Sequence, residues 1–122
     1  MRFLSMIRLQ ETGQVPSDKL MQDMGTLIDE MIRDGSLVTT AGLRPSSEGV
    51  RVRSRYGELS KTDGPFTESK EVIGGYAMLE AKSMEEAIAL TERFLRVHGT
   101  EWNLECEIRP LDGPEFCAGK DM

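Results

Sequence analysis

The chain has few of the residues that most often carry metal or redox chemistry. Its 122 residues include one histidine, His98, and two cysteines, Cys106 and Cys117, which stand eleven positions apart. A closed zinc site needs about four Cys or His ligands, so this set predicts no metal and no redox cofactor. The chain also lacks a signal-like apolar segment and any run of about 20 apolar residues, which favours a cytoplasmic protein that does not enter a membrane.

Positive charge is also scarce. There are 15 Lys and Arg residues against 21 Asp and Glu residues, which gives a net charge of −6. Nonspecific nucleic-acid binding depends on clustered cations that displace counterions, so we expect no direct nucleic-acid partner. The local exception is Arg51, Arg53 and Arg55, which alternate with smaller residues. A solvated strand face is the favoured interpretation of this alternation, and a local basic patch is the alternative.

The composition is otherwise that of one globular domain. Hydrophobic residues make up 39% of the chain and charged residues 30%, and a chain of this length can bury a single core without metal or disulfide support. We place the domain at residues 1–110 and a C-terminal tail at 111–122.

Hydrophobic periodicity and turn residues predict an α+β protein. Helices are expected over 18–34, after the N-cap Ser17, and from a capping box at Ser83–Glu86 to Gly99. Their predicted buried residues are Leu20, Met24, Leu27, Ile28 and Met31 in the first helix, and Ala87, Ile88, Thr91 and Phe94 or Leu95 in the second. Strands are expected over 1–9, 37–43, 76–81 and 101–109, with a hairpin at 50–55 and 58–62. Without the hairpin, the order is βαββαβ, the ferredoxin-like arrangement with both helices on one sheet face.

The first strand is apolar on both of its faces. Phe3, Ile7 and Leu9 alternate with Leu4 and Met6, whereas a strand with one wet face alternates apolar with polar residues. The helices cover only one face, so we expect a second copy of the chain to cover the other.

The stretch from Thr62 to Tyr76 is the candidate site. Asp63-Gly64-Pro65 is typical of a sharp chain reversal. Asp63 is the candidate acid/base group, and a turn-capping aspartate is the alternative interpretation. Nearby loop charges either clamp a polar ligand or are merely solvated. Gly74-Gly75 either lets a ligand approach the backbone or marks a β-bulge.

This stretch also carries a resemblance. Asp63-Gly64-Pro65-Phe66, with Glu68, Lys70-Glu71 and Gly74-Gly75-Tyr76, resembles the signature of the DGPF branch of the YCII-related family. The resemblance implies a ferredoxin-like unit that pairs into a dimeric α+β barrel. It implies further that relatives use a histidine and an aspartate as an acid–base pair, with one branch eliminating chloride from chlorinated aromatics. Residues 1–97 contain no histidine, so that pair cannot be carried over to this chain.

The functional prediction is a homodimer that binds an unidentified small molecule. The expected ligand contacts are Phe66, Glu68, Lys70, Gly75 and Tyr76, beside Asp63. The resemblance adds a transcription-linked role, because DGPF relatives often occur beside or fused to extracytoplasmic-function sigma factors. The alternatives are an enzyme of proton-transfer or elimination type, with Asp63 as base and Tyr76 or Lys70 in support, and a purely structural interaction module.

Overall fold

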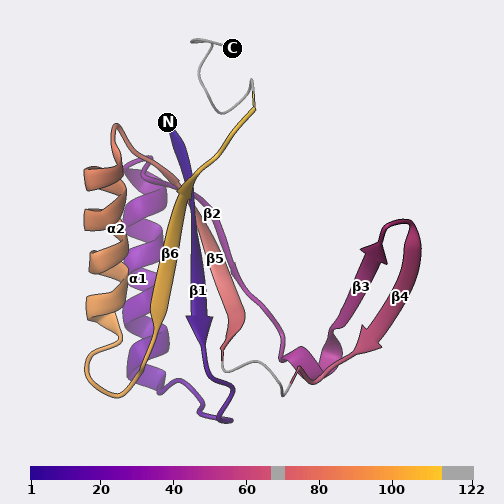
Figure 1. Cartoon of the computed structure of the whole chain (residues 1–122). Coiled ribbons are helices and arrows are strands. Elements are labelled where there is room, and N and C mark those ends of the chain that lie inside the picture. The colour runs from indigo at the N-terminus through magenta and orange to yellow at the C-terminus, as the bar shows by residue number, and fades with distance from the viewer. Residues whose placement is uncertain (67–70, 114–122) are drawn as a thin grey trace.

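The structure, a computed structural model, describes residues 1–66 and 71–113. Its elements are β1 (Arg2–Leu9), α1 (Asp18–Arg33), β2 (Leu37–Gly42), the 3-10 turn η1 (Ser46–Glu48), β3 (Val50–Arg55), β4 (Glu58–Asp63), β5 (Val72–Glu80), α2 (Met84–Val97) and β6 (Glu105–Pro110). An antiparallel sheet has the order β2-β5-β1-β6, and both helices lie on one of its faces (Figure 1). The fold is the predicted ferredoxin-like βαββαβ unit, with β3 and β4 inserted as a hairpin.

The two helices begin where the serines predict. The Ser17 hydroxyl accepts a hydrogen bond from the Leu20 N–H at 3.1 Å, and the Ser83 hydroxyl accepts one from the Glu86 N–H at 3.2 Å. The Glu86 carboxylate in turn accepts from the Lys82 N–H at 3.4 Å, so the return bond of the predicted capping box goes to the residue before the N-cap.

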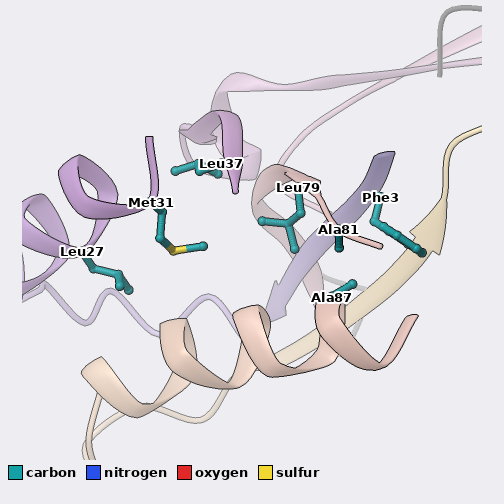
Figure 2. Close-up of a cluster of buried hydrophobic side chains, with 7 residues drawn as sticks. All are labelled: Phe3, Leu27, Met31, Leu37, Leu79, Ala81 and Ala87. Carbon is teal, nitrogen blue, oxygen red and sulfur yellow. The ribbon is translucent and has the colours of Figure 1, made fainter. Parts of the chain in front are cut away.

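The core lies between the helices and the sheet, and is built mainly from the positions that the periodicity selects. Leu27 and Met31 of α1 and Ala87 of α2 pack with Phe3 and Leu79 of the sheet (Figure 2).

One predicted core residue is wrong, because Ile88 is 42% exposed. Ala87 and Thr91, four residues apart, define the buried face of α2. Ile88 is turned about 100° from Ala87 around the helix axis.

The second sheet face is apolar at its centre. Phe3 pairs with Leu79 on the helical face, so the next residues along β1 point the other way. There Leu4 pairs with Met78 and Met6 with Tyr76. We call this surface the open face, defined by Leu4, Met6, Tyr76 and Met78. Ion pairs flank it: Arg2 to Glu80 at 2.7 Å and Arg8 to Glu107 at 3.5 Å.

Two strands begin four residues away from their predicted starts. β5 begins at Val72 rather than Tyr76, because the register shifts between Ile7 and Arg8 and passes over Gly74. Gly74-Gly75 therefore belongs to a bulge inside the strand. β6 begins at Glu105 rather than Glu101, because Glu105 pairs with Arg8, close to the end of β1, and the residues before it have no β1 register position.

Of the C-terminal tail predicted over 111–122, residues 111–113 are described and the others lie outside the described residues. The Leu111 N–H donates to the Arg2 carbonyl at 2.9 Å.

No helix in the described ranges is long and apolar enough to cross a bilayer.

The α1 methionines test the interpretation of its apolar stripe as core. Met31 is 4% exposed and Met21 is 61% exposed on the same helix. We expect Met31→Ala to lower the free energy of unfolding by about 2–5 kcal/mol, because it leaves a core cavity. Met21→Ala is the control and should change it by less than about 0.5 kcal/mol. Urea unfolding of both variants checks this, and equal midpoints would contradict the core assignment.

Candidate functional site

A cleft of about 490 Å³ opens where the hairpin joins the sheet. We name it the hairpin cleft. Its volume falls within the range of about 300–1,000 Å³ that is usual for small-molecule sites. Its lining residues are Leu43, Arg44, Pro45, Ser46, Glu48, Gly49, Arg51, Phe66, Glu71, Val72 and Ile73.

A second hollow of about 380 Å³ adjoins the hairpin cleft and shares with it the segment 43–45 and the residues Val72 and Ile73. It extends along the loop that follows β1, toward Trp102. The two hollows therefore form one depressed region that runs past the end of the sheet.

Hydrogen bonds of Ser46 connect three segments beside the cleft that are distant from one another in sequence. The Glu11 carboxylate accepts from the Ser46 backbone N–H at 2.7 Å and from the Ser46 hydroxyl. The same hydroxyl accepts from the Phe66 N–H at 3.2 Å. The hydrogen bond from the Ser46 side chain, and then that from its backbone, lowers the pKa of the exposed Glu11 carboxyl. Because Glu11 stays ionised, both of its charge-assisted hydrogen bonds persist at neutral pH.

Gly64 holds the hairpin close to η1. Its N–H donates to the Gly49 carbonyl at 2.9 Å. A Cβ at position 64 would lie 1.7 Å from the Ser46 carbonyl oxygen and 2.7 Å from its carbon. Only glycine fits this approach of one backbone to another. The peptide bond from Gly64 to Pro65 is cis.

The cleft combines apolar walls with charged groups. Leu43 and Ile73 are 52% and 50% exposed, so they present apolar surface to whatever occupies the cleft. The Arg51 guanidinium lies over the Phe66 ring, 3.9 Å from its centroid, a cation–π arrangement. Arg44 donates to Glu48 at 3.2 Å and 2.9 Å.

Two glutamates of the cleft wall form ion pairs with arginines. The side-chain hydrogen bond with Glu48, and then the charge of that carboxylate, raises the pKa of Arg44. Glu71 lies 3.9 Å from Arg8. The cleft thus offers an apolar surface with paired charges at its rim.

The predicted site residues are spread over several surfaces. Phe66 lines the hairpin cleft. Asp63 ends β4 opposite Val50, is exposed, and is not among the described lining residues. Gly75 is buried within β5, where an added Cβ would meet the Ala41 carbonyl at 2.9 Å. Tyr76 lies on the open face opposite Met6.

Two further predicted contacts, Glu68 and Lys70, lie outside the described residues. The expected ligand set therefore remains a prediction, with Phe66 as its member in the cleft.

The sequence reasoning missed Glu11, Ser46 and Arg44 as parts of the site. Glu11 is 35 residues from Ser46, and nothing in the local pattern links them. The favoured interpretation of Arg51 as part of a solvated face is wrong, because Arg51 is the half-buried member of β3 and packs on Phe66.

The remaining reactive groups lie elsewhere. The His98 ring nitrogen is 3.1 Å from the Phe94 carbonyl, and its ring packs against Phe94 and Trp102. Cys106 is half-buried, and burial raises the pKa of its thiol. Residues 1–66 and 71–113 contain no group of three or more His, Cys, Asp or Glu side chains arranged to hold a metal.

Comparison with known proteins shows the family to which this chain belongs. A model of the YCII-related domain matches residues 1–99. The chain belongs to the YCII-related family. The match includes both helices, the hairpin and every described residue of the hairpin cleft.

Individual relatives of this YCII-related protein are distant. An uncharacterized protein of Rhizobium meliloti (strain 1021) is 27% identical over 94 residues, which cover 77% of this chain and 74% of that protein. The crystal structure of CutA from Xylella fastidiosa aligns with a TM-score of 0.42 and 11% identity, over 97% of this chain and 92% of that one. Membership of the DGPF branch remains a prediction from the motif.

The close approach of Gly64 to the Ser46 backbone can be tested by adding a single methyl group at position 64. Gly64→Ala should lower the free energy of unfolding by roughly 1–3 kcal/mol, because the added Cβ meets backbone atoms that cannot rotate away. Gly25→Ala is the matched control: it lies in α1 with nothing within 4 Å of the added atom, and should stabilise by about 0.5–1 kcal/mol. Chemical unfolding of both variants measures this. A Gly64→Ala protein as stable as the parent would show that the close approach does not hold.

Proposed function

We propose that this YCII-related protein is a homodimer that binds a small molecule in the hairpin cleft. The observation that carries the binding function is the cleft itself, about 490 Å³ of space between exposed apolar residues and charged side chains. Apolar walls with a few polar groups at defined positions are usual for small-molecule sites. The ligand class that fits is a compact molecule with an apolar body, to lie on Leu43 and Ile73, and a polar end near Arg44 and Arg51.

The homodimer is supported by the open face. Leu4, Met6, Tyr76 and Met78 are half-buried and share the sheet face away from the core residues Phe3 and Leu79. A second copy that packs on this patch removes it from water, and a twofold pair buries the same surface on both copies.

Binding is favoured over acid–base catalysis. A general base must reach the proton that it removes, and Asp63 is not among the described residues of the cleft wall. The transcription-linked role rests on the DGPF resemblance and predicts that a sigma factor co-purifies with the protein.

The binding function can be tested by filling the cleft. A panel of small aromatic carboxylates and other fragments is screened by amide chemical shifts of the ¹⁵N-labelled protein. We expect hits that shift the amides of Leu43, Arg44 and Ile73. Leu43→Trp should weaken those hits by at least about tenfold, or ~1.4 kcal/mol, because the indole occupies the ligand's volume.

Val15→Trp serves as the control, because Val15 is 79% exposed and does not line the cleft. It should leave the affinity of the hits unchanged. A panel that gives no hit at the cleft, or hits that bind Leu43→Trp as well as the parent, would contradict the proposal.

A further inference from the structure

The β3–β4 hairpin extends from the body without cover. Its strands are hydrogen-bonded to each other in a separate two-stranded sheet, and every residue of both strands except Arg51 is exposed. Figure 1 shows the hairpin projecting on the side opposite the two helices. An isolated two-stranded ribbon is marginally stable in water, so a covering surface would stabilise this one.

The two faces of the hairpin differ in chemistry. Val50 pairs with Asp63, Val52 with Lys61 and Ser54 with Leu59, so these residues share one face. Its apolar members Val50, Val52 and Leu59 are 52%, 66% and 76% exposed, and we call this the valine face. The opposite face carries Arg51, Arg53 and Arg55.

The size of the valine face limits what can cover it. Six residues at about 3.3 Å each, in two strands about 4.8 Å apart, give a footprint of roughly 200 Å². A stable protein–protein interface buries about 800 Å² per partner. The hairpin alone is therefore too small to hold an independent partner, and it fits a partner that is also held by another surface. The open face is such a surface, and the hairpin projects on the same side of the molecule.

Charge also favours a second copy of the same chain. The hairpin carries Arg51, Arg53, Arg55 and Lys61 against two acidic residues, whereas the chain as a whole has a net charge of −6. The arginines lie on the face opposite the valine face, so they act at long range: the attraction between a basic arm and the acidic body of a second copy favours their encounter.

We infer that the hairpin is an arm that docks through its valine face on a second copy of the chain, whose body covers the open face. This inference rests on the homodimer in the proposed function and deepens it. The hairpin cleft lies at the root of the arm, with Arg51 of the opposite hairpin face in its wall. Each cleft is therefore placed beside the partner copy.

Two neighbouring substitutions on β4 provide the test. Leu59 lies on the valine face and Ser60 on the arginine face, and both are exposed. Sedimentation velocity of the full chain over a concentration series gives the dimer dissociation constant. Leu59→Lys should raise that constant at least tenfold, because it places a charge in the docked face, and Ser60→Lys should change it by less than twofold. Circular dichroism confirms that both variants remain folded.

Hydrogen exchange of the unmodified chain provides a second measurement. Amides of residues 50–63 should exchange slowly at concentrations that favour the dimer and faster on dilution. A dimer whose dissociation constant is the same for Leu59→Lys and Ser60→Lys, or whose hairpin amides exchange independently of concentration, would overturn the arm and leave the open-face dimer intact.

Two other outcomes would overturn the arm in different ways. A chain that is monomeric throughout the series would contradict both the docking of the hairpin and the homodimer. The fragment screen would then still test whether the cleft binds a ligand. Protection of the hairpin by a mixed-sequence DNA duplex, with none from a second copy, would assign the arginine face to nucleic acid and reject the docking.

Discussion

The arrangement of this protein depends on a sheet that its own helices cover on one face only. α1 and α2 pack on the face that carries Phe3 and Leu79. The alternation of side chains along β1 and β5 then directs Leu4, Met6, Tyr76 and Met78 to the other face. Apolar surface at about 25 cal/mol per Å² makes an uncovered patch of this kind costly in water. In the proposed homodimer, a second copy covers this patch without any additional element in the chain.

The hairpin cleft and the position of the hairpin depend on a second constraint, the close approach of two loops at Gly64. The Ser46 hydroxyl accepts a hydrogen bond from the Phe66 N–H. The Ser46 backbone lies so close to Gly64 that no side chain fits at position 64. These contacts fix where the hairpin leaves the body. They also bring Phe66 under Arg51. The Asp-Gly-Pro-Phe motif thus has a structural role at the junction, and its aromatic residue contributes to the wall of the hairpin cleft.

The fold could be predicted because its signals are local. The serine caps, the helical stripe ending at Met31 and the two-phase apolar pattern of β1 each lie within a few residues. The predicted start of β5 was wrong because the bulge at Gly74 depends on pairing with β1, which is more than sixty residues away. The exposed Ile88 shows the related limit that a stripe of apolar residues is wider than the face that is buried.

The site could be predicted only in part. The motif lies beside the hairpin cleft, and Phe66 lines that cleft, while the ligand contacts stay a prediction. The bond from Ser46 to Glu11 joins residues that no sequence pattern connects. Gly75 and Tyr76 are neighbours in β5 and point to opposite faces of the sheet, with Tyr76 on the open face. Neither residue is among the described residues that line the cleft. Proximity in sequence to a motif therefore did not mean proximity to the cleft.

The most direct test of the central claim, that a second copy covers the open face, is methionine oxidation by a brief pulse of hydroxyl radicals, read by mass spectrometry. Met6 and Met78 lie on the open face, whereas Met21 is 61% exposed on α1 and is an internal reference. A homodimer that packs through the open face predicts that Met6 and Met78 are protected relative to Met21 at high protein concentration and lose this protection on dilution. Oxidation of Met6 and Met78 at a rate relative to Met21 that does not change with concentration, in a protein that is monomeric throughout, would contradict it.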